Sequence, residues 1–113
     1  MAVGGGVRRG EVRWYPFEPP NKRRPVVILT RDSVIPVLNE MTVAPITSTI
    51  WGIASEVMLG PEDGMAQECA VNCDHLQTVF KRRLGSVITT LTEEKLAEIG
   101  PAIAFALDLD LAG

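Results

Sequence analysis

Short apolar runs alternate along the chain with segments rich in proline and glycine, a pattern typical of β-strands joined by turns. At 11–15, Val12 and Trp14 alternate with charged or amphipathic residues, which predicts a half-buried strand with Trp14 in the core. The continuous apolar run at 26–30 predicts a second, buried strand.

Four further strands are predicted, at 41–46, 55–59, 69–73 and 85–91. Pro45 lies near the end of the first of these, where a missing N–H donor is tolerated. The segment 60–64 has glycine at both ends and predicts a turn, whereas 47–53 predicts a loop. Residues 32–40 are broken by a proline, so they predict a loop or a single helical turn.

The C-terminal segment has the pattern of one helix. Thr92 is a suitable N-cap, and two acidic residues follow it in the first turn, where the helix dipole favours them. An apolar stripe at helical spacing comes next, made up of Leu96, Ile99, Ile103 and Leu107. Pro101 interrupts this stripe and predicts a kink or a split into two helices.

Together these segments predict an α+β fold of five or six short antiparallel strands closed by a C-terminal helix. The economical arrangement is a small curled barrel with the helix packed on it. The chain of 113 residues has no repeat, linker or second domain in its pattern. We predict a flexible N-terminus at 1–8 and a single domain at 9–113.

Composition narrows the class of protein. The hydrophobic fraction of 46% and the charged fraction of 22% are ordinary for a globular protein and exclude a disordered chain. No apolar run approaches the roughly 20 residues of a membrane span, and no cationic start followed by an apolar run marks a secretory signal. We therefore expect a soluble, cytosolic protein without a membrane partner.

Charge is unevenly distributed along the chain, whose net charge is −3. Residues 1–31 carry seven cations against two acids, a sum of +5, whereas 32–83 and 84–113 each sum to −4. If the N-terminal strands bring these cations together, a basic patch forms on an acidic protein. A local patch of this kind attracts phosphates even where the global charge repels them.

The two cysteines and the only histidine lie close together in the sequence, at Cys69, Cys73 and His75. On a strand the cysteines would be about 13 Å apart, beyond the roughly 7 Å Cα separation that a disulfide spans. All three side chains would share one face of that strand, but a tetrahedral zinc site needs tighter convergence and usually a fourth ligand. We therefore predict buried free thiols and no bound metal or other cofactor.

The strongest candidate for chemistry is an arginine held at the start of a strand. Pro25 restricts Arg24 to extended conformations, so its guanidinium leaves the backbone in few directions. A guanidinium is always charged and grips a phosphate with two parallel bonds. Hydroxyls follow another strand, at Thr47, Ser48 and Thr49, and one at the strand end could bond the same phosphate and stabilise charge that develops on it.

A structural role for these residues is the alternative. Arg24 would then form a salt bridge with Glu11 or Glu18, and Thr47 would cap a turn. Other kinds of site are excluded by motif, because the chain has no phosphate-binding glycine-rich loop of the Walker type, no HExxH and no GxSxG.

The chain resembles the MazF/PemK toxins of bacterial toxin–antitoxin systems in four segments, which occur in this order: "RRGEVRW", "KRRPVVILTRD", "TVAPITS" and "NCDHLQTVFKRRLGSV". The resemblance runs from about Arg9 to Asp108. It implies an SH3-like barrel with a C-terminal helix, which works as a homodimer and cuts single-stranded RNA without a metal. It also implies a cognate antitoxin whose acidic C-terminal segment blocks the site, in a complex that binds DNA.

Carried over residue by residue, the resemblance implies that Arg24 and Thr47 are the catalytic residues. Ser48 matches a neighbouring hydroxyl position of the family. Asp74 and Gln77 match a polar block that lies near the site in several relatives.

Four other residues complete the predicted RNA-binding set. Lys22 and Arg23 would strengthen the positive field and draw RNA in. Trp51, in a loop, would either stack on a base or make a dimer contact, and His75 would be a base or a structural histidine. The connection at 16–22 is shorter than in many relatives and is stiffened by prolines, a difference that bears on substrate specificity.

The implied reaction is attack of the ribose 2′-hydroxyl on the adjacent phosphorus, which leaves a 2′,3′-cyclic phosphate and a 5′-hydroxyl. Arg24 would hold the oxyanion and Thr47 would orient the phosphate, while a guanidinium that stays protonated is not an ordinary general base. Two alternatives remain open. One is a non-catalytic barrel that binds RNA or an acidic peptide, and the other is a degenerate toxin that only binds its antitoxin.

Overall fold

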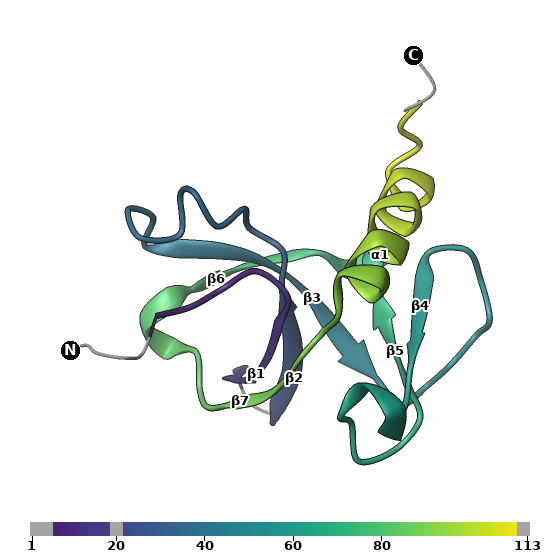
Figure 1. The fold of residues 1–113 in the computed structure, drawn as a ribbon, viewed down its shortest axis with the longest axis horizontal. Helices are drawn as coiled ribbons and strands as arrows, with labels where there is room; N and C mark the ends of the chain where they lie inside the picture. Colours follow the sequence, from purple (N-terminus) through teal and green to yellow (C-terminus); the bar gives the residue numbers. More distant parts are fainter. Residues whose placement is uncertain (1–5, 19–21, 111–113) are drawn as a thin grey trace.

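The computed structural model describes residues 6–18 and 22–110, and in this part of the chain it consists of seven β-strands, three short 3₁₀ helices and one α-helix (Figure 1). The strands are β1 (Glu11–Pro16), β2 (Arg23–Ile28), β3 (Glu40–Thr47), β4 (Glu56–Leu59), β5 (Cys69–Asn72), β6 (Gln77–Phe80) and β7 (Val87–Thr90). The helices are η1 (Pro61–Asp63), η2 (Cys73–His75), η3 (Lys81–Arg83) and α1 (Glu93–Ala106).

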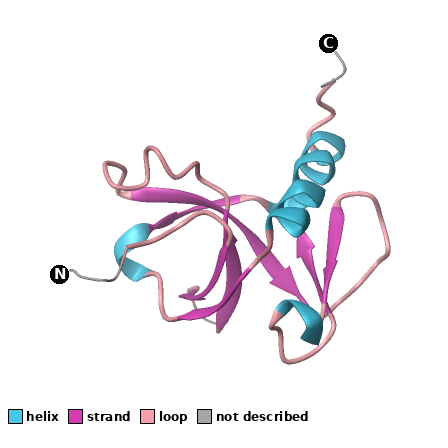
Figure 2. Ribbon diagram, viewed as in Figure 1, coloured by secondary structure: helices cyan, strands magenta, loops and turns pink. Residues whose placement is uncertain are grey.

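The strands form one curled antiparallel sheet with the order β4-β5-β3-β2-β1-β7, and β6 pairs with β3 off this path. The long strand β3 holds the curl together because it changes partners along its length. Its first residues pair with β6, its middle with β2, and its last two, Ile46 and Thr47, with β5. Figure 2 shows the curved strands with α1 beside the β4–β5 end. The predicted α+β barrel with a C-terminal helix is confirmed.

Both faces of the central strands are buried. Side chains of adjacent strand residues point to opposite faces, and in β2 Val27 belongs to one core cluster while Val26 and Ile28 belong to another. The first cluster includes Ile99 of α1, so it lies on the helix side of the sheet. The second cluster includes Ile35 of the loop before β3.

This second buried face corrects the prediction for β1. Tyr15, which the alternation placed away from the core, is buried in the second cluster, and its hydroxyl accepts a hydrogen bond from the N–H of Phe80 at 3.3 Å. Trp14 was predicted to be core but is only half-buried. It shares the face of Val12, which is in the core, but it lies further along the strand, where the sheet opens into a pocket.

The strand predictions were wrong in number and in extent. β6 was not predicted at all, since only Val79 of its four residues is buried and no alternation marks it. β2 runs three residues earlier at its start and two at its end than predicted, β5 ends at Asn72, so that Cys73 lies in η2, and β7 is shorter than the predicted 85–91. The loops predicted at 32–40 and 47–53 are present except for Glu40 and Thr47, which are the end residues of β3, and η1 forms the turn at 60–64.

The helix begins where predicted, with the Thr92 hydroxyl accepting a hydrogen bond from the N–H of Lys95. It is not split at Pro101, which lies inside a continuous helix. Leu107, predicted to be part of the apolar stripe, is the exposed C-cap, and Ala102 is buried instead. No helix in the described part of the chain combines the length and apolar character needed to cross a membrane.

Two predictions involve segments outside the described residues. The predicted flexible N-terminus at 1–8 includes residues 1–5, and the proline-stiffened connection at 16–22 includes residues 19–21. Within the described part, Val7 packs against the second core cluster.

Candidate active site

A pocket of about 470 Å³ opens where β2 and β3 separate. Val26 and Pro45 form the last pair between these strands, and Pro45 has no N–H with which to extend the ladder. Beyond it, β3 pairs with β5 instead. Residues from β1, β2, β3 and the β4–β5 connection line the opening, namely Trp14, Lys22, Arg23, Arg24, Pro25, Ile46, Thr47, Ser48, Met65, Ala66, Gln67 and Cys69.

The structure places Arg24 and Thr47 in this same pocket. The β2–β3 register pairs Val27 with Ala44 and Val26 with Pro45. Arg24 lies two residues before Val26 and Thr47 two residues after Pro45, so the two residues lie on either side of the gap between the separated strands, and both line the pocket.

Arg24 has its hydrogen-bonding capacity free for a ligand. It is exposed, and within the described part of the chain its side chain makes no hydrogen bond or ion pair. The two carboxylates proposed as alternative partners lie elsewhere. Glu11 accepts a bond from Arg13 Nε at 2.9 Å, and Glu18 lies 4.0 Å from Arg83. The salt-bridge alternative for Arg24 is therefore wrong.

Thr47 combines a structural contact with a free donor. Its Oγ1 accepts a hydrogen bond from the N–H of Thr49 at 3.0 Å, so the predicted turn-capping role is present. A hydroxyl that accepts a bond still has its proton to donate. The backbone contact thus orients the Thr47 hydroxyl, and the proton is available to a ligand in the pocket. Ser48, the next residue, is exposed and lines the same pocket.

Lys22 and Arg23 make the pocket strongly positive. Both are exposed and line it together with Arg24. The guanidinium carbon of Arg23 lies 4.4 Å from the ring centroid of Trp14, a cation–π contact that holds the side chain against the pocket wall. Trp14 therefore supports a cation at the mouth of the pocket.

The other four predicted RNA-binding residues do not line this pocket. Trp51 is 75% exposed in the loop after β3. The Asp74 carboxylate accepts a bond from the Ser55 hydroxyl at 2.5 Å, and His75 Nδ1 lies 2.8 Å from Asn72 Nδ2. Gln77 is exposed on β6.

Among the lining residues that the sequence did not indicate, three come from the connection before β5, Met65, Ala66 and Gln67. They follow η1, which is fixed to β7 because the Thr89 hydroxyl donates to the carbonyl of Asp63 at 2.9 Å. Gly64 has a φ of 93°, and a Cβ there would collide with the Thr89 hydroxyl. Gln67 contributes the one amide side chain among the described lining residues, with a donor and an acceptor to offer a base.

Both cysteines are free and buried, as predicted. Burial, and secondarily Asp74, raises the pKa of the Cys73 thiol to about 11, and burial followed by Asp63 raises the pKa of Cys69. Cys69, Cys73 and His75 do not share a strand face, because the last two lie in η2. Among the described residues, no group of three or more His, Cys, Asp or Glu side chains could hold a metal ion.

The sequence matches one family model over residues 8–107, described as PemK-like, MazF-like toxin of type II toxin–antitoxin system. Endoribonuclease MazF3 of Mycobacterium tuberculosis is 43% identical over 90 residues, which are 80% of this chain and 87% of that protein. Probable endoribonuclease MazF5 of the same organism is 41% identical over 101 residues, covering 88% and 92% of the two chains.

The fold is similar to that of solved toxins. The Mycobacterium tuberculosis toxin MazF-mt6 superposes with a TM-score of 0.81 at 39% identity, covering 88% of this chain and 98% of the toxin. An endoribonuclease from a mycobacterial species, solved in complex with its cognate antitoxin, also has a TM-score of 0.81, at 25% identity, covering 92% of this chain and 97% of that one.

Proposed function

Because the chain belongs to the family of PemK-like and MazF-like toxins of type II toxin–antitoxin systems, we propose that it is an endoribonuclease that cuts single-stranded RNA. The similar proteins named endoribonuclease support the reaction class. The single observation that carries the proposal is the pocket that Arg24, whose side chain has no partner among the described residues, lines together with Thr47.

In the proposed reaction the ribose 2′-oxygen attacks the adjacent phosphorus. The O2′–P bond forms, the P–O5′ bond breaks, the 2′-hydroxyl loses its proton and the leaving 5′-oxygen gains one. Arg24 binds the non-bridging oxygens, where negative charge grows, and the Thr47 hydroxyl donates a hydrogen bond to one of them. The backbones of both residues are fixed in strands, and the bond to Thr49 orients the Thr47 hydroxyl, which limits the reorganisation needed as charge develops.

No residue of the described pocket lining is assigned as the general base or the general acid of this reaction. A guanidinium stays protonated in proteins, so Arg24 is not an ordinary general base. His75 lies in η2, outside the residues that line the pocket, and its ring bonds to Asn72. We therefore assign the rate enhancement to stabilisation of the phosphoryl charge and leave the proton transfers to water.

The proposed partners follow from charge and exposed apolar surface. A cognate antitoxin would lay an acidic segment over the pocket, whose described lining includes three cations and no acid. A homodimer would bury exposed apolar residues of the loop after β3, of β4 and of the end of α1, namely Ile50, Trp51, Ile53, Met58, Phe105 and Leu107. We place the protein in the cytoplasm, where its RNA substrate is.

The decisive experiment is incubation of the purified protein with RNA in EDTA, followed by analysis of the ends. We expect fragments with 2′,3′-cyclic phosphate and 5′-hydroxyl ends, and no cut where the 2′-hydroxyl is replaced by hydrogen. Activity that disappears in EDTA and returns with magnesium or zinc would contradict the mechanism. RNA that binds but is never cut would favour the non-catalytic barrel instead.

A further inference from the structure

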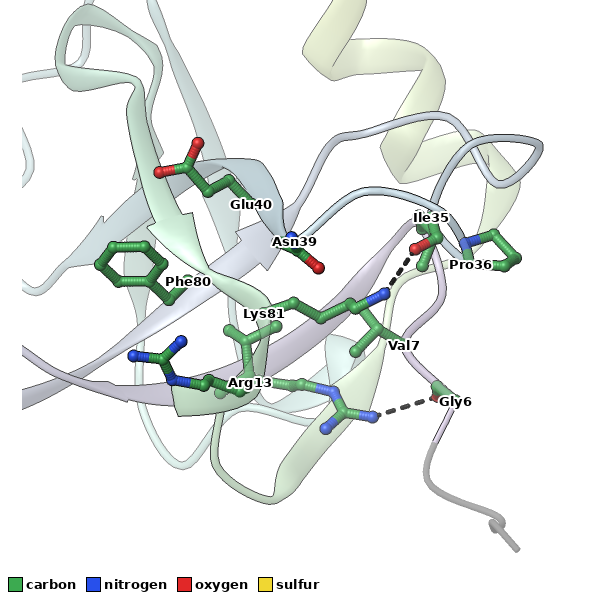
Figure 3. Close-up of a pocket in the computed structure, with 11 residues that line it drawn as sticks. Gly6, Val7, Arg13, Ile35, Pro36, Asn39, Glu40, Phe80 and Lys81 are labelled. Atoms are coloured by element: carbon green, nitrogen blue, oxygen red, sulfur yellow. Dashed lines mark hydrogen bonds between the residues drawn. The ribbon is translucent and has the colours of Figure 1, made fainter.

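A second and larger pocket, of about 880 Å³, lies against β6 and the loop before β3 (Figure 3). We propose that this second pocket is an accessory RNA site, which binds nucleotides flanking the one that is cut. The inference rests on the proposed function, since it assumes that single-stranded RNA is the substrate, but it assigns a part of the surface that the reaction itself does not use.

The cations of the second pocket differ in how many of their hydrogen-bond donors are already bonded to other protein groups. Arg13 is bound to Glu11, to the carbonyl of Gly85 at 3.1 Å and to that of Gly6 at 3.3 Å. Lys81 Nζ donates to the carbonyl of Ile35 at 2.7 Å, as Figure 3 shows. Arg82 makes no hydrogen bond or ion pair within the described part of the chain, so it is the cation that can grip a phosphate.

Phe80 supplies a flat surface beside that cation. It is 42% exposed on β6, although its neighbour Val79 is buried in the core. The guanidinium carbon of Arg82 lies 5.2 Å from the ring centroid of Phe80. A ring and a guanidinium plane stacked at a pocket wall form a platform on which any base can stack, because every base has a π-face.

Tyr15 connects this platform to the candidate active site. Its backbone pairs with Arg24 across β1 and β2, and its hydroxyl bonds to the N–H of Phe80. Arg83 lies over the Tyr15 ring at 5.5 Å and donates to the carbonyl of Pro16, the residue paired with Arg23.

One arginine–aromatic pair therefore lies at each pocket, Arg23 on Trp14 at the first and Arg82 on Phe80 at the second. The Arg83–Tyr15 pair links them through the fold, since the Tyr15 ring is buried and offers no face to a base. Repeated cations beside aromatic rings are what a single-stranded nucleic acid binds, because the cations follow the phosphates and the rings stack on bases. An acidic peptide fits the second pocket less well, since Glu40 lines it and Glu11 lies beside Arg13, whereas a neutral base can donate its amino group to a carboxylate.

The test compares two lengths of RNA. Once the cut sequence has been mapped with wild-type protein, a minimal oligonucleotide is extended on its 5′ or its 3′ side, and kcat/KM is measured for each. A stacked base contributes about 5- to 150-fold in affinity. We expect the wild type to prefer one extended series by such a factor, and Phe80→Ala and Arg82→Ala to lose most of that preference while cutting the minimal substrate normally. Phe80→Trp should retain it.

Arg31→Ala is the matched control, because Arg31 is exposed and lines neither pocket. If both substitutions leave the length preference unchanged, or if Arg31→Ala removes it equally, the proposal is wrong. It is also overturned if Phe80→Ala weakens binding of an acidic antitoxin segment but not of RNA, since the second pocket then serves the partner.

The accessory site and the proposed cleavage can fail independently. Fluorescence anisotropy with 2′-deoxy oligonucleotides of increasing length needs no catalysis. If wild-type protein cuts no RNA but its affinity rises with length in a way that depends on Phe80 and Arg82, the proposed function is wrong and the accessory site stands. If the protein cuts RNA but its affinity does not rise with length through Phe80 and Arg82, the proposed function stands and the accessory site is wrong.

Discussion

Arg13 and Arg24 lie on adjacent strands, but the guanidinium of Arg13 has protein partners and that of Arg24 has none among the described residues. The Arg13 side chain is only 11% exposed, and its guanidinium bonds to Glu11 and to two backbone carbonyls. The Arg24 guanidinium is exposed and has no partner among the described residues. An arginine carries five donors, so one that the protein has satisfied holds the fold together, and one that it has left open is directed at a ligand. The contrast separates structural from functional cations on one face of one sheet.

The largest effect should come from Arg24. Arg24→Ala should lower RNA cleavage about 100- to 1,000-fold, as expected for removal of one preorganised donor. The free energy of unfolding should change by less than about 0.5 kcal/mol, because the side chain is exposed and unpaired. Arg24→Lys should also be largely inactive, since an ammonium cannot replace the planar fork. Cleavage assays and urea denaturation on the same samples measure both quantities.

Arg31→Ala serves here too as the control for lost positive charge, and it should cut RNA normally. Thr47→Ala should resemble Arg24→Ala in activity, although the lost bond to Thr49 adds a small cost in stability. Wild-type cleavage by folded Arg24→Ala protein would end the assignment of this pocket.

Arg13 should show the opposite pattern. Arg13→Ala removes a largely buried partner of Glu11 and leaves two carbonyls without their donor, so we expect a loss of about 2–3 kcal/mol in the free energy of unfolding. Cleavage per folded molecule should stay near the wild-type value. The comparison breaks down if Arg13→Ala protein is as stable as the wild type in urea and loses activity instead.

The sequence could indicate Arg24 because its signal is local. A proline after an arginine restricts that arginine whatever the rest of the chain does. Thr47 likewise follows a proline that ends a pairing. By contrast, Gln67 follows a connection that is fixed in part by Thr89, far along the chain. Contacts of this kind leave no mark in local pattern.

The strands were predicted from local alternation, which accounts both for what the prediction found and for what it missed. Alternation correctly marked β1, but it could not show that a second cluster covers the other face, so Tyr15 was taken as outward and Trp14 as core. β6 has one buried residue and is held by pairing with the first half of β3. Long-range pairing, which sequence pattern does not contain, decides whether such a segment is a strand.

The two thiols extend the comparison to groups that the protein has enclosed. Burial raises the pKa of Cys73 to about 11 in the folded protein, above its usual value of 9.0. The unfolded chain therefore loses this proton first as the pH rises, and the folded state loses stability between the two pKa values. We expect about 1 kcal/mol less stability at pH 10 than at pH 8 from this group.

Urea denaturation across this pH range measures the effect, with Cys73→Ala as the reference that lacks the thiol. The slope of stability against pH should be shallower in Cys73→Ala, while other groups titrate equally in both proteins. Equal slopes would show that the Cys73 thiol is as readily ionised in the folded protein as in the unfolded chain.

The smallest expected effect tests whether Lys22 binds a ligand, as we propose for Arg24, or contacts only solvent. Lys22 is exposed and lines the Arg24 pocket. If it contacts one phosphate, Lys22→Ala should weaken RNA binding only a few-fold and should reduce the slope of log affinity against log salt by about 0.7, the value for one contact on a single strand.

Reversal of Lys22 and Arg23 to glutamate should weaken binding of both RNA and an acidic antitoxin peptide, and should make peptide association less sensitive to salt. Titrations of 2′-deoxy RNA and peptide binding kinetics over a salt series, with Arg31→Ala alongside, measure these slopes. If the slopes are the same for all three proteins, Lys22 and Arg23 contact neither ligand. Arg24 is then the one cation of the described pocket lining that binds a ligand.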